Sequence, residues 1–184
     1  MTFQSLVLKT ISFLEKNKIQ YLILGGIAVG VLGEARFTSD LDLDLFISKE
    51  AVPEFLKKIK KAKFKTNFAE ALKNVQTFGS FRFFCQELPV DVILASTELE
   101  KSALSRKKRL SLFNKKMSFP SPEDLILLKL IPGRPKDLLD VESIVMRHKE
   151  KLNLKYLHKW IQKICEQAED FRILHQFNKL METN

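Results

Sequence analysis

The strict alternation of Asp and Leu in residues 40–45 constrains the fold of this chain more than any other feature. Alternation is the period of a half-buried β-strand, so Asp40, Asp42 and Asp44 are expected on one face and the leucines on the other. Side chains two positions apart on a strand lie roughly 6.5–7 Å apart at their Cα atoms, and carboxylates that close raise one another's pKa unless a cation lies between them. A hard divalent ion such as Mg²⁺ suits these oxygens. The alternative is a strand face that water solvates.

A glycine pair precedes this strand. Gly25 and Gly26 follow a buried strand expected at Tyr21–Leu24 and open a short helix expected over Gly26–Gly33. Glycines at such a turn let the backbone approach a ligand, and the free N–H groups at the start of a helix favour an anion. A phosphate cradle next to metal-binding carboxylates is the equipment for phosphoryl or nucleotidyl transfer.

The two features belong to one pattern, which consists of Gly25, Gly26, Ala28, Gly33, Arg36, Thr38, Asp40 and Asp42. The pattern resembles the nucleotidyltransferase superfamily related to DNA polymerase beta and, in its finer detail, the branch that includes AbiEii-type toxins. The resemblance implies an α/β (α+β) fold in which a small mixed sheet is flanked by helices and followed by a helical C-terminal part. It also implies that NTP is a substrate and that Asp40 and Asp42 hold Mg²⁺ or Mn²⁺. A shift to Asp42 and Asp44 keeps the same strand face, but the preceding Arg36 and Thr38 favour the first pair.

The resemblance also implies nucleotide-binding roles for Gly25, Gly26, Arg36 and Thr38. In that superfamily a third carboxylate arrives on the adjacent strand, and Asp91 matches its place at the start of the apolar segment Val90–Ala95. Asp91 is therefore expected to complete the catalytic metal site. The alternative is an ordinary Asp at the start of a strand that accepts hydrogen bonds from backbone N–H groups.

A lysine interrupts the apolar run Leu125–Ile131 in the second half of the chain. Lys129 is expected to need an anionic partner because a buried charge is costly alone. With Arg134 and Asp137 it resembles the second half of AbiEii-like enzymes, which implies catalytic and nucleotide-binding roles for Lys129 and nucleotide-binding roles for Arg134 and Asp137. Asp140 is an alternative to Asp137. The competing interpretation is a structural network in which the two aspartates hold Arg134 and Lys136.

Periodicity predicts the remaining elements. The expected helices are Phe3–Lys18, Pro53–Lys61, Asn67–Asn74, a helix from Ser121 through Ile131, and a helical remainder over Val141–Asn184. The expected strands, besides those above, are Val75–Gln86 and the LSLF segment within Arg106–Lys116. That basic segment is interpreted either as a phosphate contact or as a solvated hairpin.

Charge divides the chain unequally. Residues 1–100 hold 13 Lys and Arg against 12 Asp and Glu, whereas residues 101–184 hold 18 against 10. We therefore expect a nucleotidyltransferase-like core at 1–100 and a basic, mostly helical part at 101–184, packed together as one unit. The excess charge of +8 in the second part makes tRNA or another RNA a candidate partner, although lysine-rich helices can also be simply soluble.

Several classes are disfavoured. No P-loop, dinucleotide-binding, EF-hand or zinc pattern is present, and no apolar run of about 18 residues suggests a membrane span. The two cysteines lie far apart, so a cytoplasmic protein is expected. The sequence thus predicts an enzyme that transfers NMP from an NTP to an acceptor hydroxyl on RNA, protein or a small molecule such as an aminoglycoside. A toxin–antitoxin component with a cognate antitoxin fits the resemblance. The alternative is an inactive module that binds RNA or protein.

Overall fold

A computed structural model describes residues 2–183, so Asn184, with which the expected C-terminal helical region ends, lies outside the described residues. The helices are α1 (Phe3–Lys16), α2 (Gly25–Leu32), η1 (Lys49–Ala51), α3 (Val52–Lys61), α4 (Phe68–Phe78), α5 (Glu98–Ser105), α6 (Pro122–Leu130), α7 (Pro135–His148), η2 (Lys149–Lys151), α8 (Leu154–Ala168) and α9 (Arg172–Thr183). The strands are β1 (Tyr21–Ile23), β2 (Leu41–Leu45), β3 (Ser80–Cys85), β4 (Leu88–Leu94), β5 (Lys108–Leu112) and β6 (Lys115–Phe119).

A four-stranded mixed sheet with the order β1-β2-β4-β3 organises the first half of the chain. β2 and β4 run parallel, while β1 and β3 are antiparallel to their neighbours. The register places Asp42 opposite Asp91, and Asp91 opposite Arg82. Directly paired residues share a sheet face, so these three polar side chains form one row across three strands.

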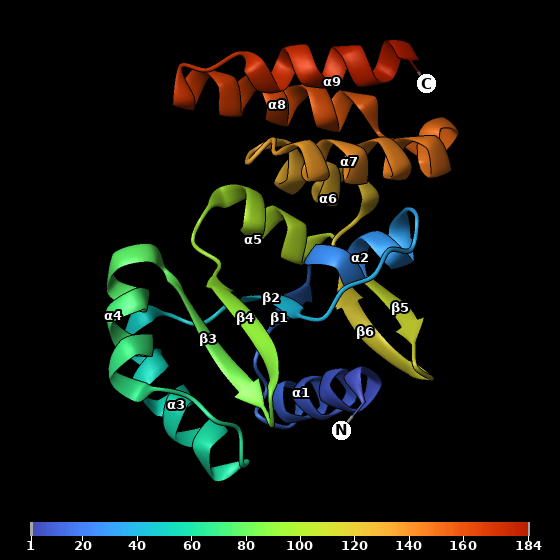
Figure 1. Cartoon of the computed structure of the whole chain (residues 1–184). Helices are drawn as coiled ribbons and strands as arrows, with labels where there is room; N and C mark the ends of the chain where they lie inside the picture. The colour runs from blue at the N-terminus through green and yellow to red at the C-terminus, as the bar shows by residue number, and fades with distance from the viewer. Residues whose placement is uncertain (1, 184) are drawn as a thin grey trace.

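The other face of the sheet is apolar. Leu41, Leu43 and Leu45 of β2 are buried there, as the alternation predicts. Edge-to-face ring contacts join Phe55 of α3 to Phe81 and Phe83 of β3, at centroid distances of 5.9 and 6.4 Å. Helices α1 and α3 therefore cover this face (Figure 1), and the opposite face carries the row of Asp42, Asp91 and Arg82.

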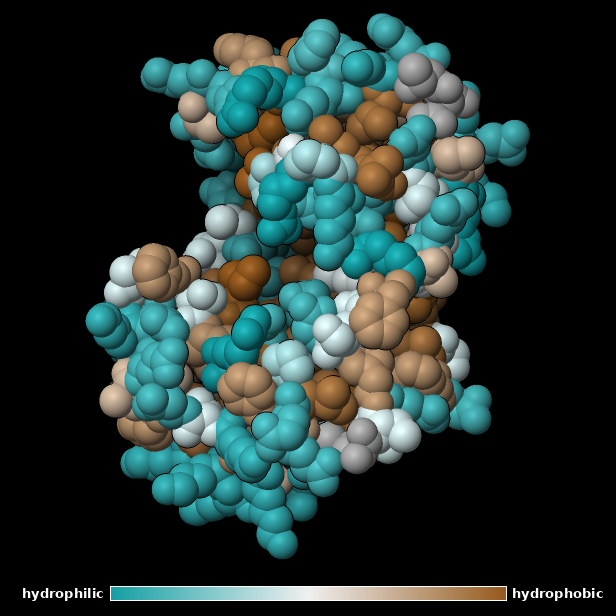
Figure 2. Space-filling model, in the orientation of Figure 1, coloured by the Kyte–Doolittle hydropathy of each residue, from teal (hydrophilic) through white to brown (hydrophobic). Residues whose placement is uncertain are grey.

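Helices α6–α9 form a separate layer above the polar face of the sheet (Figure 1). The two-stranded hairpin β5-β6 lies beside β1, and α5 leads from β4 toward it. In the same orientation the space-filling view shows the surface hollowed between the helical layer and the α/β layer (Figure 2). The mixed α/β class with a helical C-terminal part is confirmed. Leu110–Leu112 of the LSLF segment lie in the hairpin strand β5, and Phe113 lies in the turn that follows.

One predicted boundary was wrong. Residues 75–78, expected at the start of a long strand, continue helix α4, and β3 begins only at Ser80. Val75 and Ala71 lie four positions apart and are both buried on the inner side of α4, so tertiary packing outweighed the strand preference of the Phe-rich segment. Gly79 ends the helix in the left-handed conformation at φ 67°. Within the described residues no helix is both long and apolar enough to cross a membrane.

Candidate active site

Three carboxylates converge on the polar face of the sheet. Asp42 and Asp91 are register partners on β2 and β4, and Asp40 directly precedes β2. One oxygen from each carboxylate lies within 4.8 Å of the others. Burial, together with the charges of Asp40 and Asp91, raises the pKa of Asp42. A cluster of three hard oxygen donors fits a divalent cation of the Mg²⁺ type.

The glycine pair lies directly against these carboxylates. Gly25 has φ +58°, and a Cβ built on it would lie 1.7 Å from Asp42 Oδ2. A Cβ on Gly26 would lie 2.8 Å from the Cβ of Thr38. Only glycine lets the start of α2 come this close to Asp42, and both glycines line the same cavity as Asp40 and Asp42.

Thr38 and Arg36 make different contacts. The Thr38 hydroxyl donates to Asp40 Oδ1 at 2.6 Å and so orients that carboxylate. Arg36 donates two hydrogen bonds to Asp140 of α7, at 2.9 and 3.1 Å. Both residues line the same cavity, but Arg36 also links the sheet half to the helical half.

Lys129 has the anionic partners that its apolar setting requires. Its Nζ lies 3.0 Å from Asp137 Oδ1 and 2.9 Å from Asp140 Oδ2. Arg134 binds Asp137 as well, at 2.5 Å. Burial opposes ionisation of the two aspartates, but the hydrogen bonds from Arg134, Arg36 and Lys129 outweigh it and hold both pKa values below the usual range. The expected network forms with Lys129 and Arg36 as additional members, whereas Lys136 stays outside it.

Asp91 has a competing partner that the sequence did not suggest. Arg82, its neighbour on β3, donates two hydrogen bonds to it, at 2.5 and 2.8 Å. The arginine side chain is 55% exposed, so it can move aside without leaving a buried charge unpaired. The Arg82 guanidinium therefore occupies the position beside Asp91 that a metal ion in this cluster would need.

Asp44 lies on the same strand face but outside the cluster. It is 1% exposed, and neither carboxylate oxygen has a hydrogen-bond partner among the described residues. Burial, reinforced by the charges of Glu100 and Asp42, raises its pKa to about 8. The arrangement therefore favours Asp40 over Asp44 as the companion of Asp42.

A cavity of about 710 Å³ joins these groups. Its walls come from α2, β2, β4, α5, α6 and the start of α7, and its volume is within the range of about 300–1,000 Å³ that is common for small-molecule sites. Asp91 is the member of the carboxylate cluster that is not among the residues lining it. Lys136 also lines the cavity and forms no ion pair with any described residue, which leaves its ammonium group available to an anionic ligand. A ligand contact by Lys136 was not predicted from the sequence, because Asp137 and Asp140 were expected to hold this lysine.

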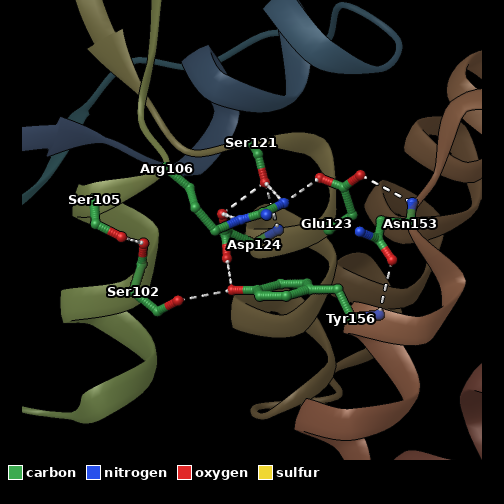
Figure 3. Close-up of polar contacts among 8 residues, drawn as sticks. All are labelled: Ser102, Ser105, Arg106, Ser121, Glu123, Asp124, Asn153 and Tyr156. Carbon is green, nitrogen blue, oxygen red and sulfur yellow. Dashed lines mark hydrogen bonds and ion pairs between the residues drawn. The ribbon is translucent and has the colours of Figure 1, made fainter.

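A second polar network holds α6 in place behind the cavity (Figure 3). Arg106 pairs with Glu123 at 3.0 Å and with Asp124 at 3.1 Å, and its guanidinium lies over the ring of Tyr156. The Tyr156 hydroxyl donates to Asp124 at 2.5 Å and also contacts Ser102 of α5. Helices α5, α6 and α8 are thereby joined. Arg109 and Lys115 of the basic hairpin segment both pair with Glu15. Part of the positive charge of this segment is therefore neutralised within the protein.

Comparisons with known proteins agree with this geometry. A family model described as "Nucleotidyltransferase of unknown function (DUF6036)" matches residues 6–183. No curated protein sequence matches the chain.

Solved structures share the fold at low sequence identity. The solution structure of the antibiotic-resistance factor ANT(2'')-Ia has a TM-score of 0.59 at 12% identity and covers 90% of this chain and 94% of its own. The lincosamide antibiotic adenylyltransferase LnuA, bound to lincomycin, has a TM-score of 0.52 at 14% identity and covers 78% and 96%. A crystal structure of ANT(2'')-Ia with adenylyl-2''-tobramycin has a TM-score of 0.50 at 13% identity and covers 79% and 89%. The nucleotidyltransferase-like fold expected from the sequence is therefore confirmed.

Proposed function

The chain belongs to the nucleotidyltransferase family whose model it matches over residues 6–183, and from this premise we propose that it moves NMP from an NTP to an acceptor hydroxyl in a divalent-metal-dependent reaction. The observation that carries the proposal is the convergence of Asp40, Asp42 and Asp91 to within 4.8 Å beside the glycine turn. In the transfer, the acceptor oxygen forms a bond to the α-phosphorus and the bond to the bridging oxygen breaks. Pyrophosphate leaves, and the hydroxyl proton passes to a base.

Three carboxylates would hold the metal. Asp40, Asp42 and Asp91 supply only hard oxygen ligands, as Mg²⁺ or Mn²⁺ prefers. A metal bound there would neutralise charge on the triphosphate and on the leaving pyrophosphate. Asp91 is also the proposed base, because release of Arg82 leaves it beside the other two carboxylates.

The protein's own cations and N–H groups would position the triphosphate. The N–H groups at Gly25 and Gly26 face the carboxylate cluster and can donate to phosphate oxygens. Lys136 lines the cavity and pairs with no acidic side chain among the described residues, whereas Lys129 is held by Asp137 and Asp140. Arg36, Thr38, Arg134 and Asp137 keep their proposed nucleotide-binding roles by lining the cavity.

The identity of the acceptor and the biological setting rest on further observations. One structural neighbour was solved with adenylyl-2''-tobramycin and another with lincomycin, which supports a small-molecule acceptor here. An RNA acceptor rests on the charge of residues 101–184, and ion pairs engage at least seven of the 18 basic side chains in that part. The AbiEii-type branch, a toxin–antitoxin role with a cognate antitoxin, a cytoplasmic location and the two-part division at residue 100 stay predictions of the sequence.

The test is Mg²⁺-dependent binding of each NTP and transfer of label from each α-labelled NTP, with Asp42→Asn as the matched variant. Saturable NTP binding that needs Mg²⁺ and is lost in Asp42→Asn supports the proposal, and labelled product adds the acceptor class. A wild-type protein that binds no Mg²⁺–NTP would overturn it in favour of an inactive module that binds RNA or protein.

A further inference from the structure

The cavity extends past the metal-binding carboxylates to a second acidic group. Asp44 is 1% exposed, lines the cavity, and has no hydrogen-bond partner for either carboxylate oxygen among the described residues. A carboxyl group buried without a hydrogen-bond partner is costly to a folded protein. A ligand that supplied a partner to Asp44 would remove this cost.

Glu100 provides a second carboxylate on the same wall. Its Oε2 accepts hydrogen bonds from the backbone N–H groups of Ser96 and Thr97, at 2.7 Å each, in the capping box at the start of α5. The side chain is therefore held in place by backbone and lines the cavity with Asp44. Among the residues that the structure describes, no lysine or arginine forms an ion pair with either carboxylate.

The cations of the cavity serve other groups. Arg36, Lys129 and Arg134 bind the aspartates of α7. The cavity thus has a region suited to a triphosphate and a metal, and beyond it a region suited to a cation.

We propose that Asp44 and Glu100 bind a protonated amino group of the acceptor, which makes the acceptor a small amine-bearing alcohol. The inference rests on the proposed function and names the substrate class of that same site. Asp44 lies two residues beyond Asp42, or roughly 6.5–7 Å along the strand, a span that a sugar ring or a short carbon chain bridges. Ile93 and Ile131, which are 49% and 47% exposed, line the same cavity and can contact its carbon skeleton. An RNA backbone would bring phosphates against two carboxylates.

The first experiment measures binding without chemistry. Wild-type protein holding Mg²⁺ and a non-hydrolysable NTP analogue is titrated with a panel of amino sugars, aminocyclitols and linear amino alcohols, and with their N-acetylated forms. We expect at least one amine to bind, with N-acetylation weakening it about tenfold or more because the cation is lost. Asp44→Asn and Glu100→Gln keep the side-chain shape and should weaken the amine by a similar factor while the Kd for the NTP analogue changes less than about twofold.

The second experiment measures label transfer from α-labelled NTP to the same panel and to total RNA. Label on amines supports the subsite if Asp44→Asn raises the KM for the amine. The same variant should also distinguish little between the amine and its N-acetyl form. Binding of no amine, equal use of amine and N-acetyl forms, or label on RNA alone overturns it. Those results do not contradict the proposed function. The proposed function fails only if the wild-type protein shows no Mg²⁺-dependent NTP binding.

Discussion

The Asp42 carboxylate occupies the position that a side chain at residue 25 would need, so only glycine fits there. A Cβ on Gly25 would lie 1.7 Å from Asp42 Oδ2 and 2.5 Å from its carboxyl carbon. Asp42 is half-buried and lies beside Asp40 and Asp91, so a side chain at position 25 would have to push it out of this cluster. The turn and the proposed metal ligand therefore depend on one another.

The first prediction concerns this pair. Gly25→Ala should displace Asp42 and lower transfer or Mg²⁺–NTP binding by about a hundredfold, since small displacements in an active site have effects of that size. The matched control is Gly79→Ala. Gly79 has φ +67°, but a Cβ there would meet nothing within 4 Å, so this variant isolates the cost of the backbone conformation. Both variants should lose about 1 kcal/mol or more of stability in chemical unfolding, and only the first should lose NTP binding.

The ion pair between Arg82 and Asp91 leads to a second prediction. Arg82→Gln removes the cation that competes for Asp91, so Mg²⁺ should bind several-fold more tightly. Calorimetric titration with Mg²⁺ or Mn²⁺ measures this directly. Lys65→Gln is the control because it breaks another exposed ion pair, with Glu87, that includes no residue of the carboxylate cluster. Weaker metal binding in Arg82→Gln would mean that the arginine supports the carboxylate cluster instead of competing with the metal.

The two lysines of the cavity should behave in opposite ways. Lys129→Met leaves two buried carboxylates with one cation each, and should lower the free energy of unfolding by about 3 kcal/mol. Lys136→Met breaks no ion pair, so its stability should stay within about 0.5 kcal/mol of wild type while the Kd for NTP rises about tenfold. Chemical unfolding and equilibrium NTP binding separate the two. Unchanged NTP binding in Lys136→Met would remove this lysine from the phosphate site.

Asp44 should make the stability of the metal-free protein depend on pH. Its pKa rises from the ordinary 3.8 to about 8 in the folded protein, so the folded state keeps a proton that the unfolded state releases. The contribution is fully present below about pH 4 and is lost as pH rises toward 8, at up to about 1.4 kcal/mol per pH unit. Asp44→Asn should remove this dependence. Unfolding is measured in chelator from pH 4 to 9, and parallel curves for the two proteins would contradict the prediction.

Tyr156 tests the network behind the cavity. Tyr156→Phe keeps the ring over Arg106 but removes the hydroxyl that donates to Asp124. We expect a loss of about 1–3 kcal/mol in the free energy of unfolding, because Asp124 is fully buried. NTP affinity should be unchanged within about twofold below the melting transition. A large loss of affinity would show that the position of α6 depends on this one hydrogen bond.

The local sequence pattern was enough to predict strand β2 with its carboxylates and the glycine turn before it. The period of two in residues 40–45 separated the carboxylates from the leucines, and the pairing of β2 with β4 then brought Asp91 opposite Asp42 as expected. The glycine pair was predictable for the same reason, because strand, turn and helix follow one another within a few residues. Short-range periodicity and backbone freedom are properties of the sequence itself.

Contacts between distant segments were decided only by the tertiary structure. Burial of Val75 and Ala71 extended α4, and the meeting of α6 with α7 placed Lys129 between two aspartates while leaving Lys136 free. The isolation of Asp44 likewise depends on which side chains of α5 and α6 surround it. Whether a charge is neutralised, exposed or left without a partner depends on burial and on residues far along the chain. The sequence by itself determined which candidate residues share a strand face or a turn, and the fold determined which of them have a charged partner within the protein.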